Sequence, residues 1–442
     1  MGSTMELRPS RAAGRVAESV LPWPPLPPHT EQQLRQLGAA DIVVGIPSYN
    51  NARTIGHVVR AAQAGLTKYF PGARGVIINS DGGSQDGTPQ AVLEATLEET
   101  ALVQAPYRVY PVHKLSLPYP GTPGKGSAFR TIFLLAQCLG AKAVAVVDAD
   151  LRSITPQWIE LLAGPVLERD FDLVAPLYMR HKYDGTITNS IVYPLTRALY
   201  GKRIRQPIGG DFGFSPRLVA HYLRQDVWET DVARFGIDIW VTTQAVAHGF
   251  RVCQAFLGAK IHDPKDPASD LSAMLAQVLS ALFTEMERNA ATWKSVSGSE
   301  PVPTFGFRFE VATEPVTVNV RRMLESFRLG CRTLREIWEP VIGAESLAHL
   351  QALACRPEGR LEFADDLWAG IVYDFAVAFH RRTVAREHLL RALTPLYLGW
   401  VASFVTEMQP AGAQEVEERL ERLCLTYEAL KPALISRWDE TG

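Results

Sequence analysis

The feature that most constrains the fold is a regular alternation of short apolar strands and amphipathic helices that begins at Asp41. Strands are expected at 42–46, 76–79, 108–112 and 144–147, and helices at 54–64, 88–97 and 126–139. Parallel strands need a crossover segment between them, so this alternation is typical of a parallel sheet flanked by helices. The sequence therefore predicts an α/β domain.

The apolar run at 144–147 leads directly into two carboxylates, Asp148 and Asp150. A strand that is apolar at every position is buried on both faces, and ligands of such sheets collect at the carboxyl ends of the strands. Two carboxylates at that edge suit Mg²⁺ or Mn²⁺, which complete their coordination with water and substrate phosphates. The alternative is structural: Asp148 ends the strand, and Asp150 starts a turn before a helix at 155–168.

Composition excludes several classes of protein. The chain has 442 residues, 47% of them apolar, and a net charge of −2, so it can bury a large core but has no basic field to attract nucleic acid. The five cysteines are scattered, odd in number and never spaced as CxxC, which argues against disulfides and a thiolate zinc site. We expect a small-molecule substrate and a reducing, cytoplasmic location.

The chain divides into three parts. Residues 1–40 form a proline-rich arm and a short helix capped by Thr30, residues 41–268 carry the alternation, and residues 269–442 read as helices in which strand signals nearly vanish. Within the second part, further strands are expected at 173–177 and 252–256, and further helices at 191–200 and 237–248.

We expect no integral membrane association. The start of the chain lacks the apolar core of a signal peptide. The apolar stretch 396–405 is too short to span a membrane, and Asp374 interrupts the stretch 368–379. The apolar face within residues 396–404 favours an intramolecular core, and a homodimer interface is the alternative.

Two loops follow the first two strands and carry polar side chains. The first, Pro47-Ser-Tyr49-Asn50-Asn51, lies where Pro47 stops the strand, and a base or ribose could lie there. The second begins at Asp81 and continues as GGSQDGT, in which glycines allow tight turns. Asp81 can accept a hydrogen bond from a pyrimidine N–H or a ribose hydroxyl.

A third loop is rich in glycine. It has the sequence GTPGKGS at 121–127 and places Lys125 at the start of a helix. An ammonium group and free backbone N–H groups together favour phosphate. The loop lacks the full P-loop pattern, which disfavours a nucleotide triphosphatase. An ordinary glycine-rich connection is the alternative.

In this order, and each at a strand end, the motifs PSYNN, DGGSQDGT, GKG and DAD resemble the nucleotide-sugar-binding half of the GT-A glycosyltransferases. Downstream, QPIGGD at 206–211, FGID at 235–238 and His262 are similar to the pattern of retaining glucosyl-3-phosphoglycerate synthases and their mannosylglycerate synthase relatives. The resemblance covers residues 41–265. It implies a GT-A fold with a mostly parallel sheet, followed here by an all-helical C-terminal domain.

The resemblance also implies roles for individual residues. The expected nucleotide-sugar contacts are Pro47, Tyr49, Asn51, Asp81, Lys125 and Asp148. The expected metal ligands are Asp150 and His262 with Asp148, and the metal is Mg²⁺ or Mn²⁺. The expected acceptor contacts are Thr186, Thr188, Gly209, Gly210 and Asp211. The expected catalytic residues are Asp148, Asp150, Lys125, Asp211 and Asp238.

Two departures from the family pattern concern substrate contacts. The family commonly has an acidic residue where Asn51 stands, so a nucleotide hydrogen bond is altered. Thr186 stands where phosphoglycerate-using members have arginine, and this weakens bidentate recognition of an acceptor phosphate. Arg180, His181 and Lys182 lie just upstream and could supply positive charge by another route, although a solvated turn is the plainer interpretation.

The resulting hypothesis is a metal-dependent retaining transferase. It would move a hexose from an NDP-sugar of UDP-glucose or GDP-mannose type to glycerate, 3-phosphoglycerate or a glycosylglycerate. An inverting transferase acting on a polyprenyl phosphate or another lipid or polysaccharide acceptor is the second hypothesis, in which Asp211 or Asp238 would be the base. A nucleotide-sugar-binding protein without turnover is the third.

Overall fold

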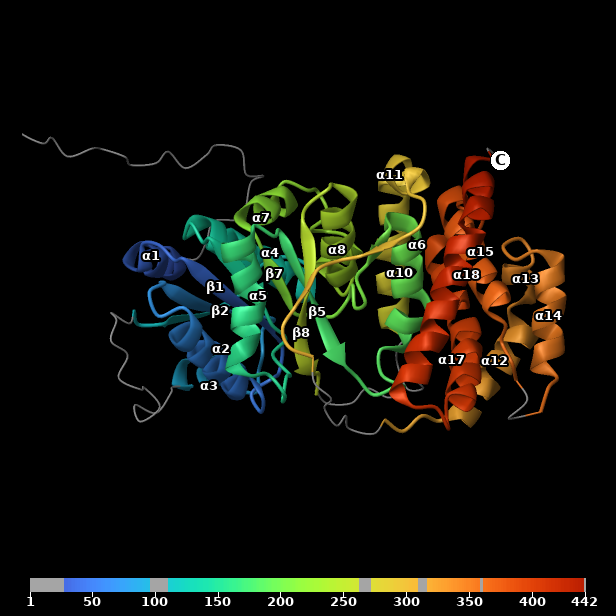
Figure 1. Ribbon diagram of the computed structural model, residues 1–442, viewed down its shortest axis with the longest axis horizontal. Helices are drawn as coiled ribbons and strands as arrows, with labels where there is room; N and C mark the ends of the chain where they lie inside the picture. The colour runs from blue at the N-terminus through green and yellow to red at the C-terminus, as the bar shows by residue number, and fades with distance from the viewer. Residues whose placement is uncertain (1–27, 96–109, 262–271, 309–315, 358–360, 441–442) are drawn as a thin grey trace, which may run out of the picture.

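The computed structural model describes residues 28–95, 110–261, 272–308, 316–357 and 361–440. Seven strands of an eight-stranded sheet, with the helices that flank it, come from residues 42–259, and most of the described chain after residue 272 is helical (Figure 1). Proline-rich residues 1–27 and His262 lie outside the described residues. The expected α/β fold with a helical C-terminal region is confirmed.

The large sheet is mostly parallel. Its strands are β1 (Ile42–Ser48), β2 (Gly75–Asp81), β3 (His113–Pro118), β4 (Ala143–Val146), β5 (Leu173–Met179), β7 (Phe212–Phe214), β8 (Val252–Ala259) and β10 (Thr304–Phe305). They lie in the order β10-β8-β5-β7-β4-β1-β2-β3, and β7 is antiparallel to its neighbours β4 and β5. The carboxyl ends of β1, β2, β4, β5 and β8 therefore meet along one edge.

Helices cover both faces of the sheet. On one face lie α2 (Ile55–Tyr69), α3 (Thr88–Glu94) and α5 (Pro156–Arg169), and on the other lie α4 (Lys125–Cys138), α7 (Pro216–Leu223) and α8 (Ile237–Ala247). β1 and β2 are buried at every position, as their near-continuous apolar sequence requires. A short helix, α1 (Pro28–Leu37), precedes β1.

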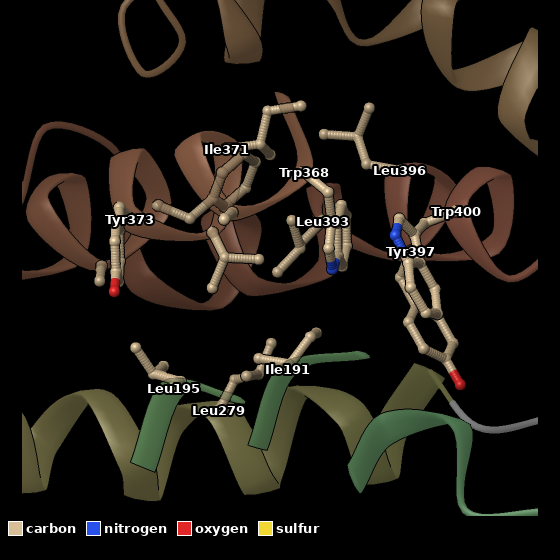
Figure 2. Close-up of a cluster of buried hydrophobic side chains, with 14 of the residues drawn as sticks. Ile191, Leu195, Leu279, Trp368, Ile371, Tyr373, Leu393, Leu396, Tyr397 and Trp400 are labelled. Carbon is tan, nitrogen blue, oxygen red and sulfur yellow. The ribbon is translucent and has the colours of Figure 1, made fainter. Parts of the chain in front are cut away.

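The helical part begins within the first half of the chain, at residues 188–200. Its members are the π-helical turn η2 (Thr188–Val192), α6 (Tyr193–Tyr200), α10 (Ser272–Arg288), α11 (Ala290–Ser295), α12 (Val320–Thr333), α13 (Arg335–Trp338), α14 (Ala344–Ala354), α15 (Asp365–Arg381), α16 (Arg386–Ala392), α17 (Thr394–Glu407) and α18 (Ala413–Asp439). Figure 2 shows their shared core, where aromatic side chains of α15 and α17 face η2, α6 and α10. Trp368 and Trp400 stack there, with ring centroids 6.0 Å apart.

The two halves of the chain are interleaved. After α11 the chain returns to the large sheet as β10, which pairs in parallel with β8 through Thr304 and Phe305. A second, two-stranded sheet joins β6 (Lys202–Arg203) to β9 (Glu300–Pro301). The division near residue 268 stays a prediction. Residues 300–305 lie after it in the sequence but pair with strands that come before it.

Three local expectations were wrong. The third strand is β3 and not 108–112, of which the described residues 110–112 are irregular: β3 buries one face through Leu115 and Leu117, whereas Pro111 has no N–H for a ladder. The first helix begins at Pro28, so Thr30 lies inside it and its buried hydroxyl has no partner. Strands β9 and β10 lie beyond residue 270, where helices alone were expected.

One stretch of the described residues, 386–407, is long and apolar enough to cross a membrane by length and composition. Of its most apolar window, 72% is buried inside the protein, among the side chains shown in Figure 2. Its apolarity is explained by this core, as expected for residues 396–405.

Candidate active site

Side chains tie together the loops that follow β1 and β2. The Asp81 carboxylate accepts hydrogen bonds from Ser48 Oγ (2.9 Å) and Ser84 Oγ (2.6 Å) and from the backbone N–H groups of Gly83 and Ser84. The backbone N–H of Asn51 donates to Thr88 Oγ1 at 2.8 Å. These bonds hold the two loops as one unit and use both carboxylate oxygens of Asp81 within the protein.

The remaining residues of the first loop are more open. Tyr49 is 63% exposed, and its ring lies beside Gly82. Asn51 Oδ1 accepts the backbone N–H of Tyr49 at 2.8 Å, and Pro47 is buried at the end of β1. An exposed aromatic ring beside a rigid loop can stack on a nucleobase.

Lys125 begins α4, and two glycines let its backbone approach the segment 232–234 closely. The N–H of Gly126 donates to Arg234 O at 3.2 Å, and a Cβ at position 126 would lie 1.9 Å from Val232 O. Gly124 has φ = 159°, and a Cβ there would lie 2.5 Å from Ala233 O. The start of α4 is therefore fixed by contacts that only glycine permits.

Two lysines and three aspartates form a cluster at the carboxyl edge of the sheet. Lys125 Nζ lies 2.8 Å from Asp148 Oδ1 and 3.1 Å from Asp238 Oδ2. Lys260, which follows β8, has its Nζ 2.7 Å from Asp148 Oδ2 and 2.7 Å from Asp211 Oδ2. Both oxygens of Asp148 are thus held by ammonium groups.

Asp211 is the aspartate of this cluster whose side chain is fully enclosed. Its side chain is fully buried, and it accepts hydrogen bonds from the Asp148 backbone N–H (2.8 Å), Lys260 Nζ and the Tyr178 hydroxyl. With these three donors its carboxylate is enclosed by protein. Asp211 therefore positions Asp148 and Lys260.

The side chains of the cluster shift one another's pKa values. Burial alone would raise the pKa of Asp148, but Lys125 and Lys260 more than offset this and lower it well below its usual value. Burial would lower the pKa values of both lysines, and the carboxylates beside them raise these values instead. Burial raises the pKa values of Asp211 and Asp238. At neutral pH, Asp148 is ionised and both lysines are charged.

The expected acceptor residues lie in different environments. Gly210 adopts φ = 91°, and a Cβ there would lie 2.4 Å from Asp148 Oδ2, while Gly209 O accepts from Lys260 Nζ at 2.8 Å. Thr186 is buried, and its hydroxyl lies 2.5 Å from the Tyr397 hydroxyl of α17. Thr188 is also buried, at the start of η2.

Of the three residues expected to hold a metal, the structure describes Asp148 and Asp150 and does not describe His262. Asp150 is half-buried, and its carboxylate makes no hydrogen bond or ion pair with the described residues. Asp238 Oδ1 is buried without a hydrogen-bond partner. No group of three His, Cys, Asp or Glu side chains in the described ranges is arranged to hold a metal ion.

Lys260 and Tyr178 were missed by sequence reasoning. Lys260 follows β8, so the strand-end argument used for Asp148 also points to it. Tyr178 occupies an apolar position in β5 and gives no sign of its polar contact with Asp211.

The fold, the site and one family comparison define the class of protein. Residues 83–284 match the family model described as the GT domain of mannosylglycerate synthase. The protein is a glycosyltransferase with a GT-A fold. Within that class, the matched segment is similar to the GT domain of mannosylglycerate synthase.

Solved structures of one enzyme are similar to part of this chain. Glucosyl-3-phosphoglycerate synthase from Mycobacterium tuberculosis with phosphoglyceric acid is 20% identical over 60% of this chain and 85% of that chain, with a TM-score of 0.40. The same enzyme with Mg²⁺ and uridine diphosphate is 20% identical over 58% and 83%, with a TM-score of 0.41. No curated protein sequence matches the chain.

Proposed function

We propose that this glycosyltransferase moves a hexose from an NDP-sugar to a small hydroxy acid, with retention of anomeric configuration and with a divalent cation. The observation that carries the proposal is the pair of ion pairs that Asp148 makes with Lys125 and Lys260 at the carboxyl edge of the sheet. The match of residues 83–284 to the mannosylglycerate synthase GT domain supports both the donor and the acceptor class.

Lys125 is suited to the leaving group. Breaking the bond between an anomeric carbon and a phosphate builds negative charge on the departing nucleoside diphosphate. Lys125 is charged, partly exposed and fixed at the start of α4, so its ammonium and the first free N–H groups of the helix stabilise that charge.

The residues present fit a cation that takes few ligands from the protein. Asp150 would hold it, because its carboxylate has no other partner among the described residues, and a buried oxygen of Asp238 is likewise without one. When bound, Mg²⁺ or Mn²⁺ neutralises charge on the diphosphate. Asp148, with both oxygens held by lysines, orients the sugar.

The acids of the cluster supply no obvious general base. Asp211 is enclosed by three donors, and one oxygen of Asp238 pairs with Lys125. This supports retention, in which a donor phosphate oxygen assists in deprotonating the acceptor on the same face. Asp238 Oδ1 can accept a hydrogen bond from a substrate hydroxyl.

The test is a transfer assay with purified protein and Mg²⁺ or Mn²⁺. UDP- and GDP-sugars are combined with D-glycerate, 3-phosphoglycerate or glucosylglycerate, and the anomeric configuration of the product is read by NMR. We expect transfer to at least one of these acids with retention. Transfer only to a lipid phosphate, or inversion at the anomeric carbon, would refute the proposal.

A further inference from the structure

A cavity of 820 Å³ lies between the catalytic sheet and the helical part of the protein. One wall is formed by the end of β5 and the middle of β8 and the other by the start of α18, and the segment 301–304 also lines it. Gly185 and Thr188, from the segment expected to contact the acceptor, also line it. Its volume is that of a site for a small organic ligand.

The cavity is rich in positive charge. Arg180, Lys182, Arg203, Arg205 and Arg308 line it, together with His181. The only acidic side chains among the described lining residues are Asp184 and Glu417.

Three of these basic groups are already engaged. Arg205 binds the Glu417 carboxylate through two nitrogens, at 2.8 and 3.0 Å. Lys182 Nζ donates to three backbone carbonyls, and Arg203 Nε donates to Ser299 Oγ at 3.0 Å. Only the charge of Arg205 is balanced by these contacts, so four cationic side chains remain with one carboxylate, and an anion would balance the excess.

Among the arginines that line the cavity, Arg180 is the one with a buried nitrogen that lacks a hydrogen-bond partner in the described part of the chain. Its Nε is buried and has no hydrogen-bond partner, and the closest approach of its guanidinium to Asp184 is 3.5 Å. The guanidinium lies over the Tyr178 ring, 5.3 Å from its centroid, and close to Gly185. A buried N–H of a charged group without a partner is costly, and an anion in the cavity can satisfy it.

The cavity adjoins the reacting cluster through Tyr178. This residue lines the cavity, and its hydroxyl donates to Asp211. Lys260 Nζ lies 5.2 Å from the centroid of the same ring. The cavity therefore lies one side chain away from the cluster, close to the place where an acceptor would react.

We infer that this cavity binds the anionic end of the acceptor and that Arg180 is its specificity-determining residue. The inference rests on the proposed function. Arg180 supplies, from the end of β5, the guanidinium that the segment 185–188 lacks. The shared chemistry is a carboxylate or phosphate oxyanion, and the volume also admits a glycosylated acid.

The test compares Arg180→Ala and Arg180→Lys with the wild type. Arg321→Ala serves as control, because Arg321 is 79% exposed on α12. Calorimetry measures the binding of inorganic phosphate, D-glycerate and 3-phosphoglycerate without donor. Transfer kinetics are then measured with D-glycerate, 3-phosphoglycerate, glucosylglycerate and uncharged glycerol.

We expect Arg180→Ala to weaken anion binding and raise the KM for charged acceptors by about 10- to 100-fold, with Arg180→Lys in between. The KM for the donor and any transfer to glycerol should not change, and Arg321→Ala should behave as wild type. Stronger loss with 3-phosphoglycerate than with D-glycerate would assign Arg180 to the phosphate, and equal loss would assign it to the carboxylate.

The calorimetry separates this inference from the proposed function. If no acid accepts a sugar but Arg180→Ala still loses anion binding, the function fails and the anion site stands. If Arg180→Ala and wild type bind all three anions equally, the inference is overturned, whatever the transfer assay shows.

Discussion

Lys260 Nζ lies 2.7 Å from an oxygen of Asp148 and 2.7 Å from an oxygen of Asp211, so one buried ammonium group holds two carboxylates in place. The side chain of Lys260 is only 4% exposed, which removes most of the water that would weaken these contacts. Electrostatic groups that are fixed before substrate arrives need no reorganisation during the reaction. Asp148 is therefore held in one orientation before any substrate binds.

Replacing Lys260 should affect both stability and catalysis. Lys260→Met leaves the buried carboxylate of Asp211 without an ammonium partner and Asp148 with Lys125 alone, which costs about 3–5 kcal/mol of unfolding free energy. We expect kcat/KM to fall by about 100-fold or more, with partial recovery in Lys260→Arg. Thermal unfolding identifies a temperature at which each variant is folded, and kinetics are measured there. Wild-type turnover in folded Lys260→Met would contradict this role.

Asp150→Asn should abolish most of the metal-dependent activity. The carboxylate of Asp150 has no other partner among the described residues, so its replacement should leave the fold intact. We expect kcat to fall by about 100- to 1000-fold and the Mn²⁺ concentration for half-maximal activity to rise. Asp226→Asn, at an exposed position of the same domain, is the control. Unchanged metal dependence in Asp150→Asn would exclude it as a ligand.

Gly126→Ala should displace Lys125. The added Cβ would lie 1.9 Å from Val232 O, so α4 must move away from the segment that fixes it. A displacement of about 1 Å at a reacting group can cost about 100-fold in rate, and we expect a loss of this size in kcat/KM for the donor. Gly164→Ala in α5 has no atom within 4 Å of the new Cβ and should retain full activity. Equal behaviour of the two variants would show that the close approach is not needed.

Stability should depend on pH through Lys431. This lysine of α18 donates to Leu199 O (3.2 Å) and Val296 O (2.6 Å), and burial lowers its pKa from 10.5 to about 8. Between about pH 8 and pH 10.5 the unfolded chain keeps a proton that the native protein has lost, so this group's contribution to stability rises with pH.

Lys431→Met removes that dependence. The unfolding temperature of the variant minus that of the wild type should therefore become more negative as the pH is raised from about 7 to about 10. Differential scanning calorimetry at a series of pH values measures this difference. A difference that stays constant with pH would contradict the lowered pKa.

Much of the fold could be predicted because its signals are local. The apolar runs of β1, β2 and β4 are buried on both faces, so the runs themselves and the polar residues that follow them identify these strands without knowledge of their neighbours. The strand-end argument likewise placed Lys125 and Asp148 at one edge of the sheet. Parallel topology makes that edge common to all the strands involved.

What could not be predicted depends on contacts between distant residues. β7 has three residues, too few for any periodicity, and Gly213 allows α5 to pack closely on it, because a Cβ there would lie 2.0 Å from Leu162 O. Thr186 bonds to Tyr397, which lies 211 residues further along the chain. The burial of Lys260 likewise follows from β8 lying beside β5, which no local pattern reveals.

The return of the chain to the sheet as β10 means that the catalytic half is not an autonomous module. Shortening the protein at residue 268 would strip β8 of an outer neighbour and leave the ring of Phe171 without Phe305. The bared strand edge would then be open to pairing with other chains. A single cut at residue 268 would therefore not separate an intact sheet from the helices that follow it.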